Sequence, residues 1–147
     1  MSSSKNLLNF DLKSLSQRSA NASLEEAKSI IISLENELHN CHKNKNPGIG
    51  LAAPQINIFK RVAIIRLLDK KINLLNPEII QSFDKTIFQD EGCLSFPNIS
   101  LRTLRYQEIV VSNDIEPYKF VATGLLAVTI QHEIDHLNGI TFFERKI

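Results

Sequence analysis

The segment with the clearest capacity for chemistry is His132-Glu133-Ile134-Asp135-His136, in which two histidines flank a glutamate in the pattern H-E-x-x-H. Positions four apart lie on one face of a helix, so both imidazoles can reach the same metal ion. Glu133 follows the first histidine and is placed to touch a water on that metal without binding the metal itself. The pattern therefore indicates a metal-dependent hydrolytic site. The alternatives are a surface helix with chance histidines and a pair of structural histidines.

A catalytic site of this kind typically has three protein ligands and a water, so a third ligand is required. No histidine follows His136, and Glu144 lies too far downstream to be a good candidate. Cys93, in the segment EGCLS at 91–95, is the upstream candidate, because a thiolate is a strong ligand and Gly92 lets the backbone approach closely. The alternative for Cys93 is a small buried hydrophobic residue, the usual role of a free cysteine.

The elements that must position these residues follow from hydrophobic periodicity and from helix and turn signals. Ser23 and Glu26 have the form of a capping box at the start of a helix predicted over 24–41. The H-E-x-x-H pattern lies on a second helix, predicted over 124–137. Strands are predicted between the two helices, at 61–67, 71–75, 78–83, 109–112 and 118–122.

The order of these elements, helix then strands then helix without β-α alternation, predicts an α+β fold. We expect small antiparallel or mixed sheets packed around the C-terminal H-E-x-x-H helix, together with the N-terminal helix. The length of 147 residues fits one domain over 1–147, with an irregular N-terminal segment at 1–22. The small and polar segments at 48–55 and 90–97 are predicted to be loops.

Charge and composition exclude several functional classes. Lys+Arg 17 against Asp+Glu 16 gives a net charge of +1, which offers no reason to bind nucleic acid or an anionic membrane. No apolar run approaches the ~20 residues of a membrane span, and two cysteines are too few for a disulfide framework. We expect a cytoplasmic protein with no nucleic-acid or membrane partner. Import into an organelle stays open because the N-terminus is rich in Ser and carries Lys5, Lys13 and Arg18.

Three segments of the chain together resemble a known family. GIGLAAPQ at 48–55, EGCLS at 91–95 and QHEIDHLNG at 131–139 are similar, in order and spacing, to the three signature motifs of peptide deformylases. The resemblance extends over about 23–143. It implies removal of the N-formyl group from the formyl-methionine of nascent peptides, with release of formate, by a metal-dependent hydrolase of linear amides.

The resemblance also assigns the metal ligands. It implies that Cys93, His132 and His136 hold one divalent metal ion, normally Fe²⁺ in this family. Zn²⁺, Ni²⁺ and Co²⁺ are alternatives, because ligand identity alone does not select among them. Glu133 would act as the general base and then as the general acid.

Further residues are implied to act on the substrate. The Gln55 side chain and the Leu94 backbone N–H would form an oxyanion hole, and the Gly50 backbone would align the substrate. The substrate's methionine side chain would enter an apolar pocket, whose expected lining is Ile49, Leu125, Val128 and Thr129.

Two positions near the second motif carry additional expectations. Glu91, included with the substrate-binding residues, fits the position of one member of a supporting ion pair in relatives, and Arg105 fits the other. The alternative is an ordinary surface pair. A basic residue that bacterial relatives often have after EGCLS corresponds to Ser100 here, which leaves substrate contacts open; Arg102 is the candidate to replace it.

The chain ends soon after its third motif, in which it resembles the short deformylases of some bacteriophages; in that case the cytoplasm would be the host's. Relatives use a further C-terminal helix to dock on the ribosome, so any ribosome association here is expected to be transient and without that helix. We expect a monomer. Two rival functions remain: a non-catalytic binding domain stabilised by metal, and a peptidase with the same metal chemistry.

Overall fold

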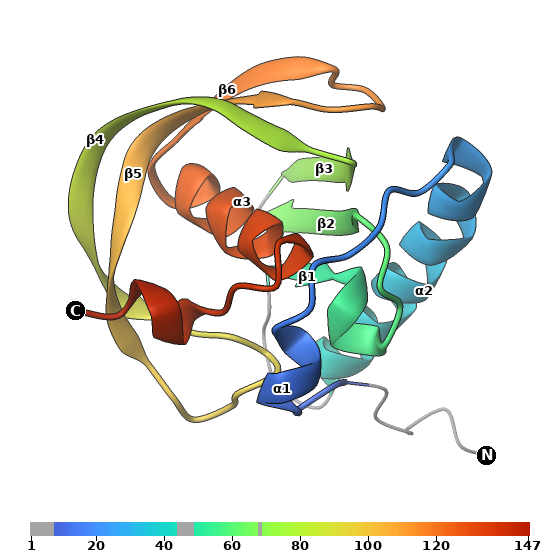
Figure 1. The fold of residues 1–147 in the computed structure, drawn as a ribbon, viewed down its shortest axis with the longest axis horizontal. Helices are drawn as coiled ribbons and strands as arrows, with labels where there is room; N and C mark the ends of the chain where they lie inside the picture. Colours follow the sequence, from blue (N-terminus) through green and yellow to red (C-terminus); the bar gives the residue numbers. More distant parts are fainter. Residues whose placement is uncertain (1–7, 44–48, 68) are drawn as a thin grey trace.

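The computed structural model describes residues 8–43, 49–67 and 69–147. In Figure 1, helix α3 lies between a strongly curved ribbon of strands on one side and a smaller sheet on the other. The elements, in chain order, are α1 (Leu12–Leu15), α2 (Leu24–Lys43), β1 (Gly50–Ala52), η2 (Ala53–Ile56), β2 (Val62–Leu67), β3 (Lys70–Leu75), β4 (Glu78–Glu91), β5 (Leu101–Ser112), β6 (Lys119–Thr123), α3 (Gly124–Leu137) and η3 (Phe142–Arg145). The architecture is α+β, as expected, and both sheets are antiparallel.

Helix α2 begins at the predicted capping box. The Ser23 N–H donates to Glu26 Oε1 at 2.8 Å, and the Glu26 N–H donates to Ser23 Oγ at 3.1 Å. The helix runs two residues beyond the predicted end, to Lys43. Its apolar stripe packs into a core with the first sheet, and the α2 members of this core are Ala27, Ile30, Leu34, Leu38 and Cys41.

The first sheet has the order β1-β2-β3 and is largely buried. Strands β2 and β3 agree with the predicted strands to within one residue. The loop predicted over 48–55 is wrong for its described part, because 50–52 form β1 and 53–56 form a 3₁₀ turn. Gly50 pairs with Ile65, so this motif is anchored to the core through backbone hydrogen bonds. Gly48 lies outside the described residues.

The second sheet has the order β4-β5-β6 and departs most from the prediction. Strand β4 continues to Glu91, where a strand ending at 83 and a loop from 90 were predicted, and β5 begins at Leu101 instead of 109. Most of β4 is exposed and lacks apolar alternation, so periodicity does not reveal it. Its register shifts near Ile79 and near Phe88, and such bulges increase the twist of a strand. The curved ribbon carries Glu91 to the side of α3.

Helix α3 occupies the predicted range and is buried on all sides from residue 127 to its end. Its apolar residues join a core with β2, β3 and β5. Gln131 binds the backbone of Tyr106 twice: it accepts from the N–H at 2.9 Å and donates to the carbonyl at 2.7 Å. Strand β6 pairs with β5 only from Glu108 onward, so this amide continues the hydrogen bonding where β6 stops.

The N-terminal segment is more ordered than the irregular chain expected over 1–22. It contains the short helix α1 and a parallel bridge between Ala20 and Lys60; residues 1–7 lie outside the described part. The Ser19 N–H donates to the carbonyl of Leu137, the last residue of α3. This segment therefore braces the helix that carries the H-E-x-x-H pattern.

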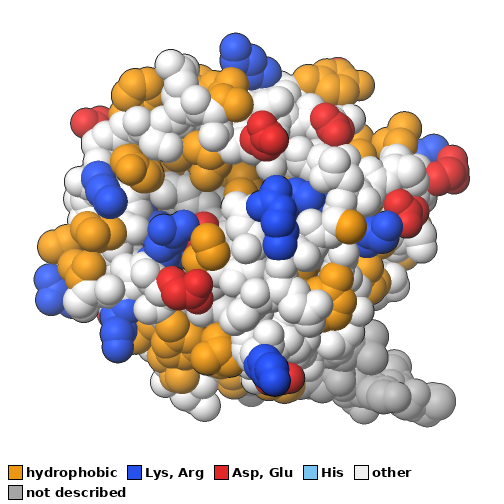
Figure 2. All heavy atoms as spheres, viewed as in Figure 1, with side chains coloured by type: hydrophobic (Ala, Val, Ile, Leu, Met, Phe, Trp, Pro, Cys, Tyr) orange, Lys and Arg blue, Asp and Glu red, His pale blue; other side chains and the backbone are white. Residues whose placement is uncertain are grey.

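The surface is mixed in charge. On the face in Figure 2, basic and acidic side chains are interspersed with apolar ones, in keeping with the net charge of +1. Among the described residues, no helix has both the length and the apolar character needed to cross a bilayer.

Candidate active site

The structure brings together the three side chains expected to bind a metal. Cys93 lies in the turn that follows β4, whereas His132 and His136 come from successive turns of α3. One ligand atom from each lies within 4.8 Å of the others. Cys93 Sγ is 3.4 Å from His136 Nε2, and the Nε2 atoms of the two histidines are 3.2 Å apart.

Two of these distances, 3.4 Å and 3.2 Å, are close to those expected around a shared cation. Three bonds of about 2.0–2.3 Å that meet at tetrahedral angles place sulfur and nitrogen ligands about 3.3–3.6 Å apart. Without a cation or proton between them, the lone pairs of two imidazoles and a sulfur would repel at this separation. One sulfur with two imidazole nitrogens suits divalent transition metals such as Fe²⁺, Co²⁺, Ni²⁺ and Zn²⁺.

The orientation of His132 is fixed by a carboxylate behind it. Glu91 Oε2 lies 2.6 Å from His132 Nδ1, which leaves Nε2 to face the other ligands. Such a carboxylate holds the tautomer and the ring orientation of a metal-binding histidine. Arg105 binds Glu91 in a fork, at 2.6 Å and 2.9 Å, and Thr103 Oγ1 donates to the same carboxylate at 2.6 Å.

This ion pair is buried, so its interpretation as an ordinary surface pair is wrong: the Arg105 and Glu91 side chains are 3% and 4% exposed. Burial by itself would raise the pKa of Glu91, but hydrogen bonds from His132 and Arg105 outweigh it and lower the pKa to about 2. Glu91 lines the cavity described below, and protein groups contact both of its carboxylate oxygens. The geometry thus gives this side chain a supporting position behind His132, and its contact with substrate stays a prediction.

Glu133 is buried at the wall of the cavity described below. It is 3% exposed, and its Oε1 has no hydrogen-bond partner among the described residues. Burial raises the pKa of Glu133 to about 7, which suits a group that takes up and returns a proton near neutral pH.

Gly50 creates the room for this carboxylate. A Cβ atom at position 50 would lie 2.6 Å from Glu133 Oε2 and 3.1 Å from its Cδ. Every side chain larger than hydrogen would therefore displace the glutamate or the strand. This steric requirement is additional to the expected alignment of substrate by the Gly50 backbone.

The Gln55 amide is held from both ends. Its Oε1 accepts from the Ala52 N–H at 3.0 Å, while its Nε2 donates to Ser95 Oγ at 3.1 Å and lies 3.6 Å from Cys93 Sγ. The amide nitrogen therefore faces the metal ligands. The sequence reasoning missed Ser95, although it is the last residue of EGCLS, because its contact with Gln55 joins residues distant in sequence.

A cavity of about 420 Å³ opens beside these groups. The four residues expected to hold a methionine side chain all line it, and Leu125 lies at its mouth because it is 48% exposed. Gly50, Gln55, Cys93, Leu94, His132 and Glu133 also line the cavity. The sequence reasoning missed a further part of the wall, which consists of Phe88, Phe96, Pro97, Asn98 and Ile99.

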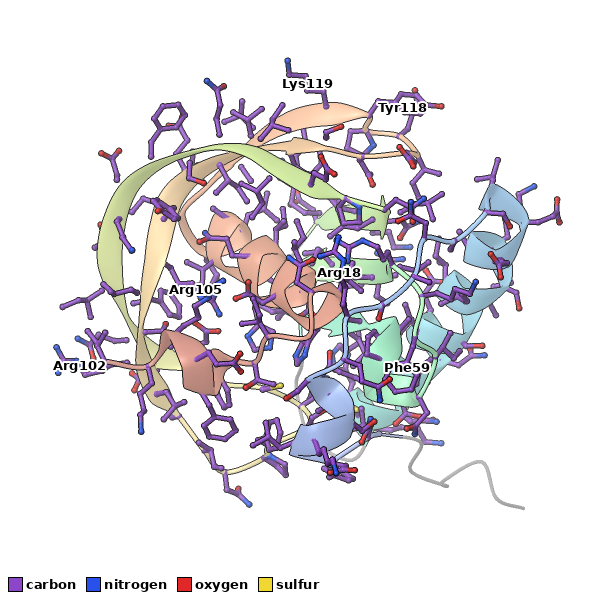
Figure 3. The ribbon with its side chains drawn as sticks, viewed as in Figure 1. Arg18, Phe59, Arg102, Arg105, Tyr118 and Lys119 are labelled. Carbon is purple, nitrogen blue, oxygen red and sulfur yellow. The ribbon has the colours of Figure 1, made fainter. Side chains whose placement is uncertain are left out.

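The two residues considered for the relatives' basic substrate contact lie away from the cavity. Neither Ser100 nor Arg102 lines the cavity. The Ser100 hydroxyl donates to Asp90 at 3.4 Å. Arg102 lies at the edge of the molecule, where its carbonyl accepts from the Ile147 N–H at 3.0 Å (Figure 3). Replacement of the relatives' basic residue by Arg102 is thus not supported.

Comparisons with known proteins agree with this geometry. The family model described as "Polypeptide deformylase" matches residues 4–146. The chain is 46% identical over 101 residues to the peptide deformylase of Heliobacterium modesticaldum and 47% identical over 102 residues to that of Natranaerobius thermophilus. Each match covers 67% of this chain, and 66% and 65% of the two relatives, just under two thirds of their length.

Solved structures show the same fold. A peptide deformylase from Synechococcus elongatus, solved in complex with actinonin, superimposes with a TM-score of 0.84 at 35% identity, over 97% of this chain and 80% of that one. The enzyme from Thermotoga maritima gives a TM-score of 0.79 at 28% identity, over 91% of both chains. Residues from all three motifs line one cavity, and the family match spans nearly the whole sequence, so this chain belongs to the polypeptide deformylase family.

Proposed function

We propose that this chain removes the N-formyl group from peptides that begin with formyl-methionine and releases formate. The observation that carries the proposal is the convergence of Cys93, His132 and His136. Two of these ligands, Cys93 and His132, line one cavity together with Glu133 and Gln55. Related proteins named peptide deformylase support the same reaction.

Cys93, His132 and His136 would hold one divalent metal ion, for which we propose Fe²⁺, with Zn²⁺, Ni²⁺ or Co²⁺ as alternatives. When bound, such an ion lowers the pKa of a coordinated water toward ~7 and polarises a carbonyl oxygen. The protein's part is to fix three donors and leave one direction open toward the cavity.

Glu133 would move the proton. Its carboxylate takes a proton from the attacking water and returns it to the departing amine, which leaves as the free N-terminus of the peptide. A pKa of about 7, raised by burial, lets the carboxylate exchange protons near neutral pH. Gly50 preserves the position from which it does so.

Gln55 would stabilise the negative charge that develops on the formyl oxygen. Its amide is oriented before substrate arrives, because Ser95 and the Ala52 N–H hold it. The Leu94 N–H is the second proposed donor. Removal of one donor from such a site typically raises the barrier by about 2.7–4 kcal/mol.

Two size limits would select the substrate. The hydrogen of a formyl group needs less room than the methyl of an acetyl group in the space bounded by Gly50 and Glu133. The apolar wall containing Ile49, Val128 and Leu125 suits an unbranched thioether. Because one methylene is worth only about 1–3 kcal/mol, residues similar to methionine should be accepted as well.

The decisive experiment compares wild-type protein and Glu133→Gln, both loaded with metal, on formyl-Met-Ala and acetyl-Met-Ala. We expect formate release by the wild type, little turnover of the acetyl peptide, and a loss of about 10²–10⁴-fold in Glu133→Gln. Equal metal content and equal melting temperature of the two proteins serve as the control.

The same samples separate the rival functions. Full activity in Glu133→Gln would remove the proposed base. New internal cleavage sites in a casein-like protein would indicate a peptidase. A metal-stabilised binding domain would bind the ion and release no formate at all.

A further inference from the structure

A row of side chains with alternating charge leads from the surface to one of the metal ligands. In order, it contains Arg145, Asp135, Arg105, Glu91 and His132. The outermost member is in η3 and lies outside all three signature segments. In Figure 3, Arg105 lies between the curved β4–β5 ribbon and α3, in the middle of this row.

The contacts along the row are short and in part doubled. Arg145 binds Asp135 with two nitrogens, at 2.9 Å and 3.0 Å, and Arg105 Nη1 reaches the same carboxylate at 2.6 Å. Burial increases inward, since the side chain of Arg145 is 41% exposed, that of Asp135 9% and that of Arg105 3%. A paired carboxylate–guanidinium fork restricts both partners in position and angle.

The row also joins two cavities. Glu91 and His132 line the catalytic cavity, whereas Arg105, Asp135 and Arg145 line a second cavity of about 450 Å³; among the described residues, none lines both. The outer end of the row therefore lies at the second cavity, and its inner end borders the catalytic cavity.

The turn that carries Arg145 contacts His132 directly as well. Phe142, in the same turn, is 1% exposed, and its ring centroid lies 5.9 Å from that of His132 at an interplanar angle of 71°. The Thr141 N–H donates to Glu144 Oε1 at 3.0 Å, which closes the turn. One short element thus supports the same histidine by ring packing and through the charged row.

We infer that Arg145 is a positioning residue for the metal ligand His132. Asp135 has two guanidinium partners, and Arg105 is shared between two carboxylates. Without Arg145, the carboxylate of Asp135 is left with Arg105 alone and draws it away from Glu91. Glu91 then holds the His132 ring less firmly, and the metal dissociates faster. The inference rests on the proposed function only in requiring that the three ligands bind a metal.

The experiment measures how fast the protein loses Co²⁺, with the absorption of the cobalt–thiolate bond as the readout after addition of excess chelator. Loss of a direct partner of a metal-binding histidine typically weakens metal binding by about 10–100-fold. Because Arg145 acts through Asp135, Arg105 and Glu91, we expect Arg145→Met to accelerate Co²⁺ loss by about 3–10-fold. Arg145→Lys keeps the charge without the fork and should be intermediate.

Arg66→Met is the matched control. It removes an arginine from another partly exposed pair, Arg66 with Glu35 at 2.6 Å, that belongs to neither the row nor the catalytic cavity. This variant should lose Co²⁺ at the wild-type rate. Wild-type loss in Arg145→Met, or equally fast loss in Arg66→Met, would overturn the inference. If Arg145→Met does not fold, Arg145→Lys decides by the same comparison.

The outcome is separable from that of the proposed function. Faster Co²⁺ loss in a protein that releases no formate would support the inference and reject the proposed reaction. Formate release by the wild type, together with a wild-type rate of Co²⁺ loss in both Arg145 variants, would support the proposed reaction and reject the inference.

Discussion

Helices α2 and α3 bury their residues in opposite ways. Helix α2 presents one stripe to the core, and five of its six buried residues are apolar. Helix α3 is buried on all sides from residue 127 to 137, and six of these residues are polar. An apolar stripe stabilises the fold through the apolar surface that it buries. A helix that buries polar side chains on all sides is stable only when those side chains find hydrogen-bond partners.

The partners on α3 divide its polar residues into two groups. Thr129, Gln131, His132 and Asp135 each have a hydrogen-bond partner within the protein. Glu133 Oε1 and His136 Nδ1, by contrast, have none among the described residues. On α3, these two atoms belong to the proposed base and to a proposed metal ligand.

The largest effect on stability is expected from α2. Leu34→Ala removes a side chain with 0% exposure from the core below the helix. It should lower the free energy of unfolding by about 2–5 kcal/mol, because it leaves a cavity in a packed core. Urea unfolding gives the loss, and formate release by the folded protein should stay at the wild-type level. A loss below about 1 kcal/mol would contradict the role assigned to the stripe.

A smaller loss is expected when a polar partner is removed from α3. Gln131→Leu leaves the N–H and carbonyl of Tyr106 without the side chain that binds them, at an expected cost of about 1–3 kcal/mol. Gln81→Leu, on the exposed part of β4, is the control and should change unfolding by less than about 0.5 kcal/mol. If both substitutions lowered the unfolding free energy equally, the hydrogen bonds of Gln131 would contribute no more than a surface side chain does.

The smallest effect concerns the one buried thiol of α2. Burial, reinforced by Glu37, raises the pKa of Cys41 to about 11, above the ordinary value of 9.0. Stability that depends on the neutral thiol is complete below pH 9 and is lost as the pH rises toward 11, because the unfolded chain ionises first. Between pH 9 and pH 11, the unfolding free energy of the wild type should therefore fall relative to that of Cys41→Ala. A constant difference would show that Cys41 ionises equally in both states.

The contrast between the helices also explains what the sequence could predict. The range of α3 and the stripe of α2 follow from periodicity, and the ligand set follows from spacing combined with the resemblance. Strand β4 was predicted too short because its stability comes from pairing with β5 and not from an apolar face of its own. Ser95 and Arg145 act through partners distant in sequence, at Gln55 and Asp135, and no local pattern encodes such contacts.

The absent side chain at Gly50 has a consequence for attempts to alter this protein by directed evolution. Because a Cβ atom at that position would lie 2.6 Å from Glu133 Oε2, substitutions there should displace the proposed base and lower activity. The adjacent Ile49 lines the mouth of the cavity and is only partly buried, so randomisation is better spent on that residue. Substitution at position 50 should therefore act on proton transfer, whereas substitution at position 49 should act on which substrate side chain fits.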